Sequence, residues 1–184
     1  MRIDSGALLW DHFFVRDREK ELILKPEIAL FAAMSQIINP FNDEHFMRRA
    51  LAEAQYAFEQ DEVPIGAIVV ANRQIIGRGY NQVEMLKDAT AHAEMLALTA
   101  AGQYLRSKYL TDCTLYVTIE PCPMCAGALR WAQLSRVVYG AHEPKHGFSR
   151  FGGEMFHPKT EIVGGILADE AAALMKTFFQ SKRK

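Results

Sequence analysis

Two short stretches of the sequence decide the fold, T-A-H-A-E at residues 90–94 and E-P-C-P-M-C at residues 120–125. Each contains residue types that ligate metal ions, and each leads into an alanine-rich run that favours a helix. Pro121 and Pro123 suit a helix entry, because the first helical N–H groups have no partner within the helix. We therefore expect two helix N-termini to converge on one point.

The metal-ligating residues of the two stretches are one histidine and two cysteines. One imidazole and two thiolates form a zinc site with three protein ligands, and its open fourth position is typical of catalytic zinc. Cys122 and Cys125 are three residues apart, so both sulfurs lie on one side of the first helical turn. The helix dipole there stabilises each thiolate by up to about 1 kcal/mol. We expect His92, Cys122 and Cys125 to bind one Zn²⁺ per subunit.

Glu94 follows the histidine by two residues and is left free for proton transfer. Residues i and i+2 of a regular helix point about 200° apart, so His92 has to lie at the helix entry while Glu94 reaches over the site. A zinc ion lowers the pKa of bound water toward about 7. Glu94 is expected to take that proton, pass it to a ring nitrogen and then protonate a departing amine. H-x-E followed by P-C-x-x-C is the signature of zinc-dependent base deaminases.

A structural zinc site is the alternative interpretation of the C-x-x-C pair. Such a site needs a second pair of ligands, and Cys113 is the only other cysteine. We expect Cys113 to be a small buried side chain instead. The remaining histidines could become ligands only by an accident of folding; they are His12, His45, His142, His146 and His157.

The composition indicates one globular domain without a strong overall charge. The chain has 184 residues, of which 49% are hydrophobic, and its net charge is −1. It can bury a sizeable core, but any RNA contact has to come from a local basic patch. Three cysteines make no disulfide framework and suit a reducing cytosol. No signal peptide and no apolar run of about 18 residues is visible. We expect a cytoplasmic protein with no membrane partner.

Hydrophobic periodicity and turn residues predict four helices and five strands. The order of these elements implies a mixed sheet covered on both faces. The expected helices begin at Asn42, at His92 (ending at Gly102), at Ala126 (ending at Gln133) and near Asp169. The expected strands are 66–71, 74–80, 114–118, 136–139 and 161–166, with loops at 81–89 and 141–158.

The N-terminal part of the chain contains none of these chemical motifs. We expect residues 1–41 to be an extension and residues 42–184 to form the zinc-dependent domain. Within the extension, residues 1–33 are either a short accessory helix or loose tail, or a translated leader upstream of a natural start at Met34. In the second case, a chain that starts at Met34 keeps full activity.

The sequence closely resembles the family of bacterial tRNA-specific adenosine deaminases, which convert the wobble adenosine of an anticodon to inosine. The similarity runs from about Asn42 to Lys184. It rests on motifs at Glu62–Ala67, Asn81, Ala89–Glu94, Leu115–Ala128, Val137–Ala141 and Gly165–Glu170.

This resemblance implies a cytidine deaminase-like fold of the α/β class, a three-layer α/β/α sandwich with a mixed five-stranded sheet. It also implies a homodimer whose second subunit helps to form the RNA surface. The implied reaction is zinc-dependent hydrolytic deamination of the wobble adenosine in a tRNA anticodon stem-loop, with an arginine tRNA as the expected substrate.

The resemblance also assigns RNA contacts. It implies that Asn81 contacts the flipped nucleoside and that Ile65 lies against the base. Glu143, Pro144 and Lys145 would border the neighbouring anticodon nucleotides. Lys182 and Arg183 would approach phosphates of the stem.

A basic loop supports RNA binding independently of the family. Its cations alternate with phenylalanines, which suits splayed-out single-stranded bases. Burial of these phenylalanines in the core or in a dimer interface is an equal alternative. The residues concerned are Lys145, His146, Arg150, His157 and Lys159, with Phe148, Phe151 and Phe156.

The chain departs from the family pattern at three positions. Ala89 stands where proline is usual, and this loosens the approach to His92. Glu143 replaces a common aspartate, which leaves its nucleotide contact open. Ala171 replaces a cysteine as a packing change.

Two other functions remain open from the sequence alone. Deamination of a free base or nucleoside, such as guanine, competes because P-C-P-M-C occurs in guanine deaminases too. A non-catalytic, zinc-stabilised RNA-binding module is the second, but it would have no use for the Glu94 carboxylate.

Overall fold

The computed structural model describes residues 41–152 and 154–183, and their elements follow the predicted order. Those elements are α2 (Asp43–Glu59), β1 (Gly66–Ala71), β2 (Gln74–Tyr80), α3 (Val83–Leu86), α4 (Ala93–Leu105), β3 (Thr114–Ile119), α5 (Pro123–Trp131), β4 (Arg136–Ala141), the 3₁₀ helix η1 (Phe148–Phe151), β5 (Glu161–Gly164) and α6 (Ala168–Ser181). The predicted extension and the proposed start at Met34 lie outside the described residues, apart from Phe41.

The strands form one mixed sheet in the order β2-β1-β3-β4-β5. β1 pairs antiparallel with β2 and β3, whereas β3, β4 and β5 run parallel. The hairpin between β1 and β2 turns at Asn72 and Arg73, which have φ of 49° and 63°. Two successive positive φ values match the twist of a tight hairpin. The prediction of a mixed five-stranded sheet is confirmed.

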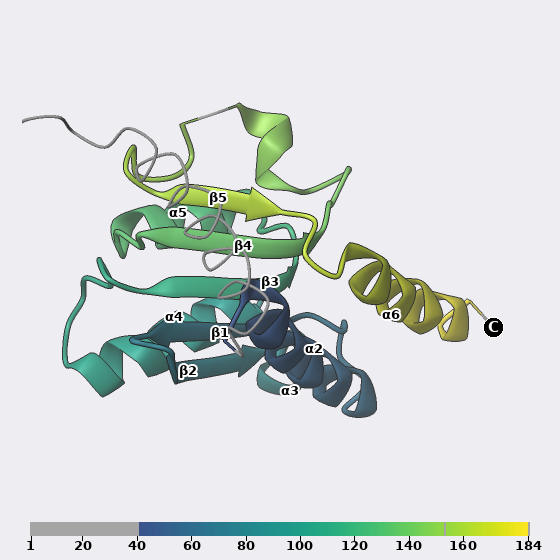
Figure 1. Ribbon diagram of the computed structural model, residues 1–184. Helices are drawn as coiled ribbons and strands as arrows, with labels where there is room; N and C mark the ends of the chain where they lie inside the picture. The colour runs from purple at the N-terminus through teal and green to yellow at the C-terminus, as the bar shows by residue number, and fades with distance from the viewer. Residues whose placement is uncertain (1–40, 153, 184) are drawn as a thin grey trace, which may run out of the picture. The chain divides into compact units, whose positions relative to one another are not determined.

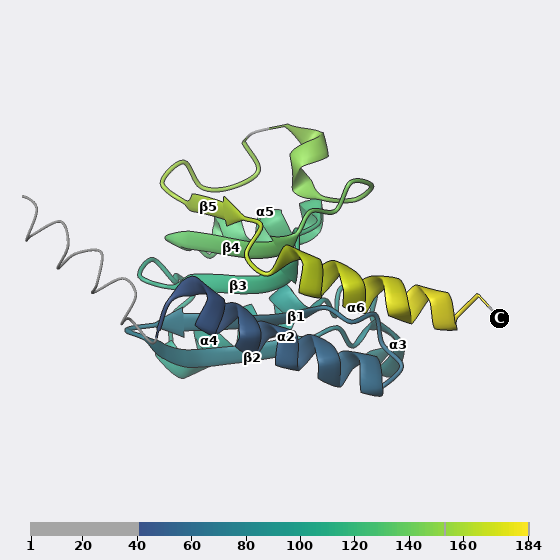
Figure 2. The same ribbon diagram turned by 45° about the vertical axis from the view of Figure 1, so that its right-hand side comes forward.

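Helices cover both faces of this sheet, as Figures 1 and 2 show. Alternate strand residues point to opposite faces, so Val69 and Val117 pack in the core beneath α4 and α5. Ile68 and Tyr116 pack on the other face, against α2. Ala171 of α6 packs on that same side, in a small cluster of its own. The three-layer α/β/α sandwich is therefore confirmed.

Two glycines of β2 let α4 lie unusually close to the sheet. A Cβ on Gly79 would come 2.3 Å from the carbonyl oxygen of Ala93, and one on Gly77 would come 2.4 Å from that of Ala97. No side chain fits these gaps. Ala93 is the first residue of α4 and His92 is the residue before it. The close contact between α4 and β2 therefore determines the position of His92.

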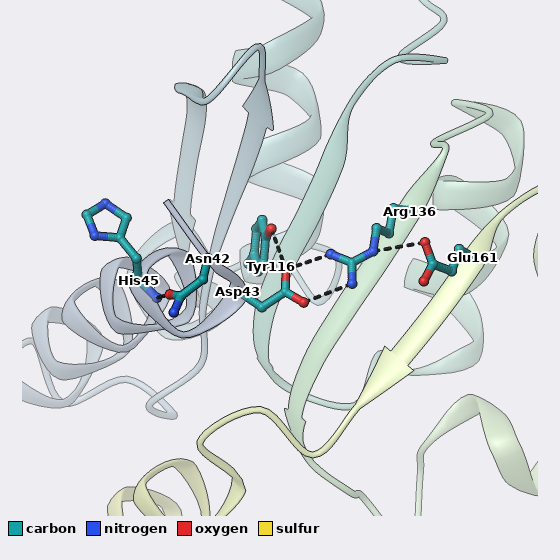
Figure 3. A network of polar contacts seen from close by, with 6 residues as sticks. All are labelled: Asn42, Asp43, His45, Tyr116, Arg136 and Glu161. Carbon is teal, nitrogen blue, oxygen red and sulfur yellow. Dashed lines mark hydrogen bonds and ion pairs between the residues drawn. The ribbon is translucent and has the colours of Figure 1, made fainter. Parts of the chain in front are cut away.

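A polar network ties the start of α2 to three strands (Figure 3). The Arg136 guanidinium donates to both carboxylate oxygens of Asp43, at 2.6 and 2.8 Å, and to Glu161 at 3.0 Å. The Tyr116 hydroxyl also donates to Asp43, at 2.9 Å. The network therefore links α2 with β3, β4 and β5.

Several element boundaries differ from the prediction; β5, for example, ends at Gly164 rather than at residue 166. The helix after His92 does not end at Gly102 but continues to Leu105, where Arg106 adopts the left-handed conformation with φ 51°. The helix of the second motif begins at Pro123 rather than Ala126, with Cys122 as its N-cap, so the expectation that both cysteines lie at the helix entry is confirmed. The segment 81–89 is not all loop, because it contains the single turn α3.

Within the part of the chain that the structure describes, no helix is long and apolar enough to cross a membrane.

Candidate active site

The three predicted metal ligands come together from two helix starts. His92 is the N-cap of α4, with extended backbone angles, and Cys122 is the N-cap of α5. Cys125 lies in the first turn of α5 and is fully buried. His92 therefore stands at the helix entry, as its spacing from Glu94 requires.

The spacing of these three side chains fits a zinc ion. His92 Nδ1 lies 3.6 Å from the Cys122 sulfur and 3.5 Å from the Cys125 sulfur. In a tetrahedral site with ordinary zinc bond lengths, a nitrogen and a sulfur ligand are about 3.6 Å apart. The donor atoms of the three residues all lie within 4.8 Å of one another. One imidazole and two sulfurs at this spacing suit zinc better than Mg²⁺ or Ca²⁺, which prefer oxygen ligands.

The two cysteines titrate as a linked pair. The hydrogen bond from the Cys125 thiol, helped by His92, lowers the pKa of Cys122 to about 4. The same bond is the main reason that the pKa of Cys125 is raised. The hydrogen bond with Cys122 also raises the pKa of His92. The site therefore holds a ready thiolate, and a metal that takes all three ligands displaces protons.

Glu94 lies beside the three ligand side chains and is not one of them. Its residue is only 4% exposed, and burial raises the pKa of its carboxyl group. A carboxyl group with a raised pKa holds a proton more readily than an exposed one and can return it to a substrate. This is the property needed for a proton shuttle.

A cavity of about 690 Å³ opens over these groups. Of the predicted site residues, it brings Ile65, Glu143, Lys145 and Arg183 together with Glu94 and with two of the three ligands, His92 and Cys122. The full lining is Ile65, His92, Glu94, Ile119, Glu120, Cys122, Glu143, Pro144, Lys145, His146, Met175, Lys176, Phe179, Gln180 and Arg183. The walls are the loop at 143–146 and one side of α6.

Three predicted site residues do not line this cavity. Asn81 is buried and donates to the Glu62 carboxylate at 3.0 Å. The Arg150 guanidinium donates to the backbone oxygen of Lys145 at 3.2 Å, outside the cavity lining. Lys182 forms an ion pair with Asp61 and lines a second cavity.

Glu120 is a site residue to which the sequence analysis gave no role. Its buried carboxylate accepts hydrogen bonds from the backbone N–H groups of Glu143, at 3.0 Å, and Ser149, at 2.9 Å. Burial opposes its ionisation, but these bonds outweigh that effect and lower the pKa of Glu120. A Cβ on Gly147 would come 2.5 Å from the Glu120 carboxyl carbon. Glu120 thus fixes the loop that forms one cavity wall.

The sequence signal for Glu120 was its place in the second motif, two residues before Cys122. The cavity residues Lys176 and Phe179 were also missed. The only indication of them in the sequence was their spacing, because Lys176, Phe179 and Arg183 are three and four residues apart.

Comparison with known proteins gives a consistent set of relatives. The family described as the cytidine and deoxycytidylate deaminase zinc-binding region matches residues 40–141. A tRNA-specific adenosine deaminase of Bacillus subtilis is 43% identical over 147 residues, covering 77% of this chain and 91% of that protein. A chloroplastic tRNA(adenine(34)) deaminase of Arabidopsis thaliana is 45% identical over 159 residues, covering 75% of this chain but 12% of the longer plant protein.

Solved structures resemble the chain as well. A structure from a study of A-to-I editing by tRNA:A34 deaminases at the wobble position has a TM-score of 0.67 and 40% identity. It covers 71% of this chain and 98% of the other. The guanine deaminase of Bacillus subtilis has a TM-score of 0.53 and 41% identity, covering 55% of this chain and 65% of that one.

Proposed function

The chain belongs to the family of tRNA-specific adenosine deaminases, within the zinc-binding cytidine and deoxycytidylate deaminase group, and we propose that it converts the wobble adenosine of tRNA to inosine. The observation that carries this proposal is the position of Glu94, buried beside a zinc-type ligand cluster at the base of an open cavity. The expected substrate is the anticodon stem-loop of an arginine tRNA.

The chain's own residues account for the proton transfers of this reaction. His92, Cys122 and Cys125 would hold the zinc ion, which when bound activates water at neutral pH. Glu94 accepts the proton of the attacking water and delivers it to the purine nitrogen beside the reacting carbon. Glu94 then takes the remaining proton of the attacking oxygen and gives it to the amine, which leaves as ammonia while the oxygen becomes the ring carbonyl of inosine. Water and adenosine are consumed, and inosine and ammonia are formed.

The cavity walls are suited to hold a flipped base. Ile65 lines the cavity and offers an apolar surface to the base, while Lys145 lines it from the loop fixed by Glu120. An anticodon loop is already partly unstacked, which lowers the flipping cost of a few kcal/mol. Asn81 is proposed to support the site through Glu62.

The protein is further proposed to act as a homodimer in the cytoplasm. Trp131 at the end of α5 is 81% exposed and Phe151 is 62% exposed, and large exposed aromatic side chains are enriched at protein interfaces. The three cysteines are free thiols, as expected in a reducing compartment.

A substrate panel tests the proposal against the guanine deaminase alternative. Ammonia release is measured with an anticodon hairpin that carries a wobble adenosine, and with free guanine, cytidine and adenosine. We expect release from the hairpin only. Release from guanine or cytidine, with none from the hairpin, would overturn the assignment.

A further inference from the structure

The carboxylate of Glu120 lies at the centre of the loop that follows β4. The backbone N–H of Ser149 donates to its Oε1 at 2.9 Å, and the backbone N–H of Glu143 donates to its Oε2 at 3.0 Å. His142 contacts the same Oε2 through its ring nitrogen Nδ1. Both carboxylate oxygens are therefore bonded to the loop, at its start and at its end. We call these contacts the Glu120 anchor.

The residues that line the cavity lie between the two ends of this anchor. They are residues 143–146. Two further backbone bonds close the loop, from the N–H of Gly147 to the oxygen of Glu143 at 3.0 Å and from the N–H of Phe148 to the oxygen of Pro121 at 2.9 Å. The shape of this cavity wall is thus determined by bonds that do not themselves face the cavity.

The Glu120 side chain can act on a substrate only through the loop, because 0% of its surface is exposed. Gly147 packs directly against it. A Cβ at Gly147 would come 2.5 Å from the carboxyl carbon of Glu120 and 2.6 Å from its Oε1. Glycine at this position therefore leaves the carboxylate free to receive the N–H groups at both ends of the loop.

These contacts leave Glu120 no part in metal binding or in proton transfer. Among the residues that the structure describes, the donor atoms that cluster at metal-binding distance belong to His92, Cys122 and Cys125. The acid that is buried beside them is Glu94. Both oxygens of Glu120 are already bonded to the loop, and a buried carboxylate that loses its hydrogen bonds is costly. The loop is therefore held closed around Glu120.

We propose that Glu120, together with His142, is a positioning residue that holds the 143–146 wall in the shape that receives the nucleotides beside the target adenosine. A wall that is ordered before the RNA binds loses little conformational entropy on binding. The Glu120 anchor thus lowers the KM for the hairpin, while kcat depends on Glu94 and on the metal ligands. This inference rests on the proposed function.

Glu120→Gln tests the anchor, because it keeps the shape of the side chain but replaces one acceptor oxygen by a donor that faces an N–H group. The KM for a wobble-adenosine hairpin should rise about 10- to 100-fold. We expect kcat to stay within about threefold of wild type, and metal analysis to find one zinc per chain. A merely structural role beside Cys122 would instead lower kcat and zinc content together.

Two other variants disturb the anchor without changing Glu120. Gly147→Ala places a methyl group against the carboxylate and should raise KM in the same way, whereas Gly127→Ala, whose Cβ meets no atom within 4 Å, is the matched control and should leave KM unchanged. His142→Ala removes one contact and leaves both backbone donors. Because the His142 side chain is 58% exposed, its loss should raise KM only about two- to fivefold.

Amide hydrogen exchange tests the anchor without any substrate. The N–H groups of Glu143 and Ser149 should exchange slowly in the wild-type protein, because they are bonded to a buried carboxylate. In Glu120→Gln they should exchange at least about tenfold faster. Equal exchange rates in the two proteins would show that Glu120 does not hold the loop, and would overturn the inference.

The outcomes separate this inference from the proposed function. If the wild-type protein edits the hairpin but Glu120→Gln and Gly147→Ala keep the wild-type KM, or lose zinc and kcat together, the positioning role is wrong and the function stands. If the wild-type protein neither binds nor edits the hairpin, both are wrong.

Discussion

Glu94 connects the sequence motif to the chemistry at the scale of single residues. It is the group for which a zinc-stabilised RNA-binding module would have no use, and it is buried beside the ligand cluster with a raised pKa. Removal of the carboxylate should therefore abolish catalysis without removing the metal site.

Glu94→Gln keeps the shape of the side chain but cannot transfer the proton. We expect deamination of the hairpin to fall by a factor of about 10² to 10⁴, while metal analysis still finds one zinc per chain. Cys125→Ser is the matched contrast, because it should lose zinc and activity together. Activity of Glu94→Gln within tenfold of wild type would contradict the proton-shuttle role.

At this scale the sequence predicted side-chain type better than side-chain direction. The metal ligands and Glu94 could be predicted because their spacing along the sequence is known without the fold. Lys182 and Arg183 are neighbours in sequence, yet one pairs with Asp61 and the other lines the cavity. Only the packing of α6 against α2 determines which of them faces the substrate.

At the scale of elements, the contact between β2 and α4 holds His92 in place. Gly79→Ala would place a methyl group 2.3 Å from the backbone oxygen of Ala93. Either α4 or the strand has to move, and we expect a loss of stability of about 1–3 kcal/mol, together with weaker zinc binding. Urea denaturation and metal titration measure the two effects.

Gly127→Ala is the control for this substitution. A Cβ at Gly127 meets no atom within 4 Å, and alanine is favoured over glycine inside a helix by about 0.5–1 kcal/mol. Gly127→Ala should therefore be neutral or stabilising. Equal stability of the two variants would show that the close approach of α4 to the sheet is unimportant.

The Asp43 network makes stability depend on pH. The hydrogen bonds of Arg136, opposed by burial, hold the pKa of Asp43 below its usual value in the folded chain. The network therefore contributes fully above the unfolded pKa of about 3.9, and its contribution is lost as the pH falls through the lowered folded pKa. Asp43→Asn should cost about 1–3 kcal/mol at pH 7.

The free energy of unfolding of Asp43→Asn and wild type is compared in urea from pH 7 down to pH 3. The difference should shrink as the pH falls below about 3.9, because the unfolded wild-type chain then takes up a proton that Asp43 in the folded chain does not. A difference that stays constant down to pH 3 would show that the ion pair contributes nothing to stability.

Element types were predictable from periodicity, but some boundaries were not. The turn α3 exists because the backbone N–H groups of Glu84 and Met85 donate to the Glu62 carboxylate, at 3.2 and 2.7 Å. That partner lies on a distant segment, so no local pattern reveals it. Glycine usually marks a helix end, but α4 passes Gly102 and ends when Arg106 takes the left-handed conformation.

At the scale of the whole molecule, the sandwich places two helix starts, a cavity and two walls around one point. β2 and β3 flank β1 and both run antiparallel to it, so the segments that follow them lie at the same edge of the sheet and bring Glu120 and Cys122 close to the start of α4. The order of the predicted elements indicated a mixed sheet covered on both faces, and the family resemblance indicated the three-layer sandwich. The sequence could not predict the cavity walls, because they depend on how the 143–146 loop and α6 pack.

The most direct measurement is sequencing of an unedited tRNA pool after incubation with the protein, with and without a zinc chelator. Adenosine should be read as guanosine at the wobble position only, and this change should disappear with chelator and return when zinc is added back. Unchanged wobble adenosine would contradict the proposed function. Editing that persists after the metal has been removed would contradict the zinc-dependent mechanism.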